Sequence, residues 1–325
     1  MSAVQTNLQP TTGRLEPVLT DEVDERCAQA LGALKGIYVP HDKHRAIRSK
    51  INTLRISCLP MLGTGEAFEG RAVVEKTGAG KTTILKRLAR ETNATPTADG
   101  AINPYRVVYI EMKVAGTLNM LIRRILKKVG DPNWNKGNAD DVRDRLEISF
   151  EERKVELLIV DEVQHLKGAS KDKLAIADEL KGLLDSGIVP VVFAGTEKAK
   201  EFFEENVELA GRLGDLLDLS PAKRSSRTDR RNFRDFCRAL DQEIRKAGIF
   251  EIPSAIAEPH CLTALITASG GHLGRVCRIV TVAVEHALRR EAEFVEVYDL
   301  DAAVQTFAIP RRYCIENPFR KGQRQ

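Results

Sequence analysis

Several features that would narrow the function are missing from this sequence. Its six cysteines include no CxxC pair, so neither a zinc module nor a disulfide framework is indicated, and we expect reduced, packed thiols. Lys and Arg total 50 against 46 Asp and Glu, and the resulting net charge of +4 does not by itself require a nucleic-acid partner. Any basic contact surface must therefore be local.

Long apolar segments are missing as well. The N-terminus, MSAVQTNLQPTTGRLEP, has no charged segment followed by an apolar one, so no secretory signal is visible. The longest strongly apolar run, 188–194, is too short to cross a bilayer. Neither an internal repeat nor a long low-complexity segment is present. These absences predict a cytoplasmic protein.

Apolar strands alternate with helical patterns in the first two thirds of the chain. Each strand is apolar on both faces, which is typical of a parallel sheet covered by helices on both sides. Pro190 indicates that regular pairing of the fourth strand starts late. The sequence thus predicts an α/β fold with a parallel five-stranded sheet, its strands at 71–75, 106–112, 155–162, 188–195 and 216–220.

The alternation ends near residue 222, and the remaining pattern is helical. We therefore predict four segments along the chain. They are a flexible leader (1–20), an α/β domain with an N-terminal helical segment (21–221), a small all-helical lid domain (222–308) and a basic tail that forms an extended arm (309–325).

The stretch VVEKTGAGKTT, residues 73–83, follows the first predicted strand and opens a helix. Glycines at 78 and 80 would let backbone N–H groups turn toward an anion, and Lys81 would neutralise phosphate charge. Thr82 would ligate Mg²⁺. The phosphate-loop pattern normally begins with Gly, and here that position is Glu75. A match this short also arises by chance. On its own it therefore fits both a nucleotide-binding loop and an accidental sequence match.

A second motif favours the nucleotide reading. LLIVDE, an apolar strand ending in Asp161 and Glu162, follows about 80 residues after Lys81. Asp161 would hold the Mg²⁺ hydration shell and Glu162 would act as general base toward the attacking water. An acidic pair after a strand also caps helices. Because both motifs end neighbouring parallel strands, where such sheets bind ligands, we predict an ATP and Mg²⁺ site.

Two further positions fit this site. The Thr196 hydroxyl, after the fourth strand, would lie near the γ-phosphate, although local chemistry equally favours a helix N-cap. Arg275, early in the last long helix, would reach the phosphates from the lid, and its alternative is a solvated helix face.

These motifs, with GRLGDLLDL and SGGHLGRV downstream, resemble AAA+ ATPases, and within them the TniB/TnsC group of bacterial transposition ATPases. The resemblance covers roughly residues 40–300. It implies Walker A at Lys81 and Thr82, Walker B at Asp161 and Glu162, and a P-loop fold that binds ATP with Mg²⁺. The implied nucleotide-binding set is Thr77, Gly78, Ala79, Gly80, Lys81, Thr82 and Thr83.

The resemblance also assigns residues that local chemistry leaves open. It implies that Thr196 is sensor 1, Arg275 is sensor 2, and Arg212 is an arginine finger that reaches the neighbouring subunit's ATP. Without the resemblance, Arg212 reads equally well as a surface charge. An arginine finger implies a homo-oligomer in which each site is completed in trans.

For partners, the resemblance implies ATP-dependent rings or filaments on double-stranded DNA, a DDE-type transposase and a TniQ-like targeting protein. Contacts to DNA phosphates would be tolerant of sequence and sensitive to salt. For each single candidate, a solvated helix face is the competing interpretation. The candidate DNA contacts are Lys113, Arg123, Arg124, Lys127 and Lys128.

Three functions follow from this reading. The first is an ATP-hydrolysing transposition regulator on target DNA. The second is a nucleotide-gated DNA scaffold with little hydrolysis, which Glu75 keeps open. The third is another AAA+ machine, such as a helicase loader or clamp loader, or a secretion ATPase.

Overall fold

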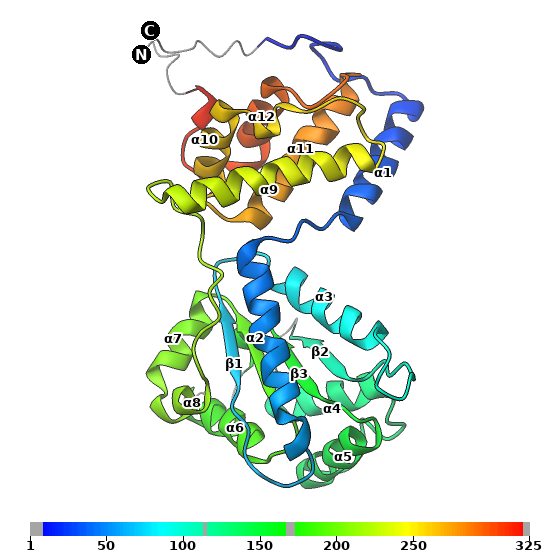
Figure 1. Cartoon of the computed structure of the whole chain (residues 1–325), viewed down its shortest axis with the longest axis vertical. Helices are drawn as coiled ribbons and strands as arrows, with labels where there is room; N and C mark the ends of the chain where they lie inside the picture. Colours follow the sequence, from blue (N-terminus) through cyan, green and yellow to red (C-terminus); the bar gives the residue numbers. More distant parts are fainter. Residues whose placement is uncertain (1–8, 113–115, 167–172, 321–325) are drawn as a thin grey trace. The chain divides into compact units, whose positions relative to one another are not determined.

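The computed structural model describes residues 9–112, 116–166 and 173–320. The chain divides into two compact units, which Figure 1 shows with most of their helices and strands labelled. Lys43–Leu219 forms one of them, which we call the α/β unit. The chain up to Asp42 and the chain from Ser220 onwards form the other, the helical unit. Within the described residues, no helix is both long and apolar enough to cross a membrane.

The α/β unit is built on a four-stranded parallel sheet with the strand order β1-β4-β3-β2. The strands are β1 (Arg71–Val74), β2 (Val107–Glu111), β3 (Leu157–Asp161) and β4 (Val191–Gly195). The prediction that β4 starts late is confirmed, since it begins directly after Pro190. The helices are α2 (Asp42–Cys58), α3 (Lys81–Ala94), α4 (Leu118–Val129), α5 (Ala139–Glu152), α6 (Lys173–Asp185), α7 (Glu197–Glu205) and α8 (Val207–Arg212).

Helices cover both faces of this sheet, as predicted. Along β3, Leu157 and Ile159 pack on the side of α2 and α3, while Leu158 and Val160 pack on the side of α4, α5 and α6. This alternation follows from the two-residue period of a strand. All five residues of β3 are buried, so an apolar run here indicates a strand covered on both faces.

The predicted fifth strand at 216–220 is wrong. The chain does run beside β1: Gly214 N donates to Gly70 O at 3.1 Å and Leu217 N donates to Ala72 O at 2.8 Å. It advances three residues between these bonds while β1 advances two, and this mismatch prevents a regular ladder. The apolar pattern of the segment reflects the burial of Leu217 and Leu219 in the core instead.

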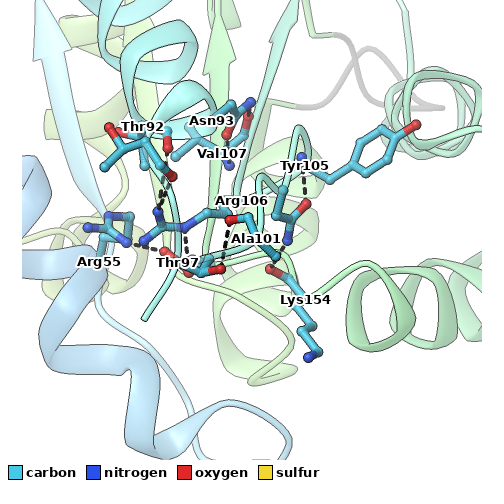
Figure 2. Close-up of polar contacts among 12 residues, drawn as sticks. Arg55, Thr92, Asn93, Thr97, Ala101, Tyr105, Arg106, Val107 and Lys154 are labelled. Carbon is cyan, nitrogen blue, oxygen red and sulfur yellow. Dashed lines mark hydrogen bonds and ion pairs between the residues drawn. The ribbon is translucent and has the colours of Figure 1, made fainter. Parts of the chain in front are cut away.

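A buried ion-pair network ties α2 to the amino ends of β2 and β3. Figure 2 shows Arg55 of α2, Asn93 of α3 and Arg106 gathered at the start of β2. Glu156, just before β3, accepts hydrogen bonds from Arg106 Nε at 2.8 Å and from Arg55. Asn93 accepts from Val107 N at 2.8 Å and donates to its carbonyl at 3.0 Å. These contacts hold the first helices against the sheet.

The helical unit has its own apolar core, formed mainly by one face of each of its longer helices. A fully buried Arg290 pairs with Asp299 at 2.8 Å and with Glu296 at 2.5 Å. A guanidinium buried this deeply needs such partners, because an unpaired buried charge is very costly. The helices are α1 (Asp21–Gly36), α9 (Arg227–Lys246), α10 (Pro259–Ala268), α11 (Leu273–Arg289) and α12 (Val297–Ala303).

Parts of the predicted domain division do not match this unit. Residues 21–36 were expected in the α/β domain, but the buried stripe of α1 (Val23, Cys27 and Ala30) belongs to the helical core. The expected flexible leader is bound from Thr11, whose N–H donates to Glu296 at 3.0 Å. In the expected extended tail, Phe319 is buried. Apolar and capping contacts distant in sequence fix all three segments.

Candidate functional site

The phosphate-loop residues connect the end of β1 to the start of α3. Gly78 has a φ of 87° and Gly80 a φ of 103°, backbone conformations that favour glycine. A Cβ on Gly80 would also lie 3.0 Å from His44 Nε2 of α2, so this position is restricted twice. The loop's Ala79 is buried, whereas Thr77 and Thr83 are exposed. The glycines thus allow the turn that the sequence predicted.

Lys81 is the first residue of α3 and is only 5% exposed. Its ammonium donates to the carbonyl oxygens of Glu75 and, at 3.2 Å, of Lys76, so it lies under the loop. Burial lowers the pKa of Lys81, and the nearby carboxylates of Glu162 and Asp161 oppose that shift. A buried ammonium at a helix N-terminus between two carbonyls is placed to receive an anion.

Asp161 ends β3 and is fully buried. Its Oδ2 accepts hydrogen bonds from Thr82 Oγ1 at 2.7 Å and from Tyr109 OH at 2.6 Å, and its Oδ1 accepts from Glu162 N at 2.8 Å. The two predicted metal ligands, Thr82 and Asp161, are therefore in direct contact. This pair of a hydroxyl and a carboxylate suits Mg²⁺, which prefers oxygen ligands.

Tyr109 was not predicted as a site residue. Burial and the adjacent Asp161 carboxylate raise its pKa strongly, so the phenol stays protonated and remains a donor to that carboxylate. The signal in the sequence is weak, because a Tyr inside RVVYIEM reads as an ordinary strand residue. Its contact with Asp161 depends on the pairing of β2 with β3.

Glu162, the predicted general base, has left-handed backbone dihedral angles, with a φ of 59°. Such a conformation is uncommon outside glycine and is found at functional sites. Gln164 Nε2 donates to the Glu162 carboxylate, and Gln164 Oε1 accepts from Thr196 N at 3.1 Å. Gln164, which was not predicted as a site residue, therefore links Glu162 to the end of β4.

Thr196 is the N-cap residue of α7, but its side chain makes no capping hydrogen bond. Gly195 before it has no room for a side chain, because a Cβ there would lie 2.7 Å from Gln164 Oε1. The carbonyl of Gly195 accepts from Glu75 N at 3.2 Å. The ends of β1, β3 and β4 thus meet at one edge, around Lys81, Asp161 and Thr196.

Glu75 replaces the first glycine of the phosphate-loop pattern. It is not among the described non-glycine residues with a positive φ, so no glycine is required there. Its Oε1 accepts from the N–H of Lys76 at 2.8 Å, and its charge acts on the pKa of Lys81. The carboxylate is therefore on the loop itself, where it would repel a phosphate.

Of the two predicted arginines, only Arg212 belongs to the α/β unit, and it lies away from these strand ends. Arg212 ends α8, its carbonyl accepts from Gly70 N at the amino end of β1, and its Nε lies 2.7 Å from Asp185 Oδ1. That is the amino end of β1, whereas the phosphate loop follows its carboxyl end. Arg275 belongs to the helical unit, where its guanidinium stacks over the Tyr313 ring at 4.6 Å. Their roles at a nucleotide stay predictions.

The candidate DNA contacts differ in their surroundings. Arg123 donates to the carbonyls of Gly137 at 2.6 Å and Lys136 at 3.2 Å, so it holds the loop after α4. Arg124 Nη1 lies 3.7 Å from Met112 Sδ. Lys127 and Lys128 are exposed, with Lys127 over the Trp134 ring at 4.6 Å. Lys113 is outside the described residues. DNA contact stays a prediction for all five.

One group of potential metal ligands lies in the helical unit. Ligand atoms of Glu258, His260 and Cys261 are within 4.8 Å of one another. Cys261 is fully buried, and burial raises the pKa of its thiol strongly. A metal needs the thiolate, so this burial disfavours metal binding there. The described site that best fits a metal is therefore Thr82 and Asp161.

Comparison with known proteins adds a family and a fold. The family model for the bacterial TniB protein matches residues 42–218, more than half of the chain. The chain belongs to the TniB family. No curated protein matches the sequence. The matched region spans every strand of the α/β unit and both predicted Walker motifs of this TniB-family protein.

Solved structures share the AAA+ fold with this TniB-family chain. Cdc6p from Pyrobaculum aerophilum has a TM-score of 0.58 and 16% identity, covering 89% of this chain and 71% of its own. The Aeropyrum pernix ORC1 protein in complex with DNA has a TM-score of 0.60 and 18% identity, covering 84% and 68%. At such low identity the likeness establishes the fold alone.

The position of Glu75 generates a binding prediction for the TniB-family protein. We expect Glu75→Gly to tighten ATP binding by about threefold to tenfold, because a carboxylate beside the phosphates is removed. Glu75→Gln should match this gain, since the backbone at Glu75 does not need glycine. Isothermal titration with ATP measures both. A gain in the glycine variant alone would assign the effect to backbone freedom, and no change in either would make Glu75 a tolerated substitution.

The contacts of Gln164 generate a kinetic prediction. We expect Gln164→Ala to lower kcat for ATP hydrolysis by about 10–100-fold, because Glu162 loses the donor that orients it. The KM for ATP should stay within about threefold, since the hydrogen bonds described for Gln164 go to Glu162 and Thr196, outside the phosphate loop. In a Glu162→Gln background, Gln164→Ala should cause no further loss in kcat. Independent, multiplicative losses would contradict this link.

Proposed function

We propose that this TniB-family protein binds ATP with Mg²⁺ and hydrolyses it to ADP and phosphate. The observation that carries the proposal is the 2.7 Å contact between Thr82 Oγ1 and Asp161 Oδ2 beside the buried Lys81. It supports the proposal because the predicted phosphate-binding cation and the two predicted metal ligands lie together at the carboxyl ends of the strands, where such folds bind ligands.

Each residue then has a separate task in hydrolysis. Lys81 and the N–H groups of the loop would bind the phosphates, and Thr82 and Asp161 would hold Mg²⁺, which neutralises phosphate charge when bound. Glu162 would take the proton of the attacking water, oriented by Gln164. Thr196 would place its hydroxyl near the γ-phosphate.

We further propose that ATP drives assembly of the protein on double-stranded DNA, in the service of transposition. The TniB family supports this role, as do fold relatives solved with DNA, such as ORC1 from Aeropyrum pernix. By resemblance to transposition ATPases, the partners would be a DDE-type transposase and a TniQ-like targeting protein. Pull-down with a transposase separates this function from that of a helicase or clamp loader.

A nucleotide-gated scaffold with little hydrolysis is the second candidate function. One observation favours it, the Glu75 carboxylate on the phosphate loop. Its charge would slow turnover without preventing nucleotide binding. ATP turnover measured with and without DNA separates the two functions, since only the first requires turnover.

Electron microscopy with duplex DNA tests the proposed function. We expect rings or filaments with ATP and none with ADP or without nucleotide. Glu162→Gln should assemble like the wild type but hydrolyse ATP far more slowly, because it loses only the base. Glu147→Gln, an exposed carboxylate on α5, serves as the control for the charge change. A monomer indifferent to ATP and DNA would refute the proposal, and unchanged turnover in Glu162→Gln would refute the choice of base.

The predicted arginine finger gives a complementation test. Arg212→Ala should bind ATP normally, because residue 212 lies at the end of β1 opposite to its own phosphate loop. It should lose turnover, because the neighbouring subunit's site lacks its arginine finger. Mixing Arg212→Ala with Glu162→Gln should restore part of the activity, since some interfaces would pair an intact Glu162 with an intact Arg212. Turnover of the mixed sample in a phosphate-release assay decides. No recovery on mixing, with assembly intact, would reject the finger.

A further inference from the structure

Helix α9 of the helical unit carries arginines that the proposed nucleotide site does not use. Successive helix residues are about 100° apart, so five of these arginines fall within an arc of about 100° and extend over about 17 Å of the helix. We call them the arginine stripe: Arg227, Arg230, Arg231, Arg234 and Arg238.

The packing of α9 fixes which way the stripe faces. The side of the helix next to the stripe is buried in the core of the helical unit through Phe233, Phe236, Cys237, Leu240 and Ile244. Four of the stripe arginines are exposed, and the side chain of Arg234 is 41% exposed. The guanidinium groups therefore form a continuous outward face on a rigid helix.

Little acidic charge compensates this face. Asp235 lies 3.2 Å from Arg234 and 3.8 Å from Arg231. In the described part of the chain, Arg227, Arg230 and Arg238 form no ion pair, and Arg230 donates to the Arg224 carbonyl at 2.6 Å. Toward the end of α9 the balance changes, because Arg238 shares a hollow of about 420 Å³ with other charged residues, namely Asp241, Arg245 and Glu258.

We propose that the arginine stripe binds the phosphate backbone of double-stranded DNA. Guanidinium groups match phosphate geometry, and arginines three or four positions apart lie about 5–6 Å from each other, a dense row of cations for a densely charged duplex. The proposal rests on the DNA-associated function proposed above. It adds a contact surface in the helical unit to the candidates in the α/β unit.

An acidic protein segment is the competing partner, and the composition of the face argues against it. Protein interfaces bury an apolar or aromatic centre within a polar rim. Among the described residues, none of the exposed large apolar side chains lies on α9. A surface of cations without an apolar centre suits contacts to a polyanionic backbone, which position a protein without reading sequence.

The test compares charge-matched variants of the full chain for binding to a fluorescent duplex, by anisotropy across a salt series. The stripe variant carries Arg227→Gln, Arg234→Gln and Arg238→Gln. The control carries Arg26→Gln, Arg90→Gln and Arg143→Gln, three exposed arginines outside the stripe. We expect the stripe variant to bind roughly tenfold or more weakly near 0.1 M salt, with the salt slope reduced by about two to three. The control should stay within about threefold.

Further measurements separate the outcomes. Replacing the same three stripe arginines by Lys should keep most of the affinity and the salt slope, and ATP turnover without DNA should be equal in all variants that melt at the wild-type temperature. Equal weakening of stripe and control variants, with wild type binding, overturns the stripe but not the proposed function. No DNA binding by wild type in any nucleotide state overturns both. A stripe variant that keeps DNA binding but loses polyglutamate binding overturns DNA as its partner.

Discussion

The hydrogen bonding of one buried carboxylate holds the candidate site together. Asp161 is fully buried at the end of β3, and an unpaired charge there would cost several kcal/mol. Its three donors come from the start of α3, from β2 and from the following N–H: Thr82, Tyr109 and Glu162. Satisfying this carboxylate therefore fixes the start of α3 against the sheet, and with it the position of Lys81.

The same physical requirement acts at the other end of β3. Glu156 lies just before the strand and accepts hydrogen bonds from Arg55 of α2 and from Arg106 before β2. This fully buried strand thus has a charged anchor at each end, one to α2 and one to α3. These two helices cover the same face of the sheet. The phosphate loop between β1 and α3 is consequently held on a rigid frame, which phosphate recognition needs.

Features that depend on residues close together in the sequence were predicted correctly. Gly78, Gly80 and Lys81 act within one turn, so their spacing alone predicts the loop. Tyr109 and Gln164 were missed because their roles depend on contacts between different strand ends. The fifth strand was wrong because Leu217 and Leu219 are apolar for burial and not for pairing. An amphipathic helix such as α1 shows that one face is buried, but its sequence does not say against which unit.

The layout of the charged residues links hydrolysis to assembly in our proposal. The proposed phosphate and metal ligands all lie at the carboxyl ends of the strands, while Arg212 lies beside the amino end of β1. Four residues of strand span about 13 Å, too far for an arginine side chain to return to its own phosphate loop. A finger at this position therefore serves only a neighbouring copy. If the arginine stripe holds each copy on DNA, then DNA brings the neighbour close, and the assembly on DNA hydrolyses ATP faster than the protein without DNA.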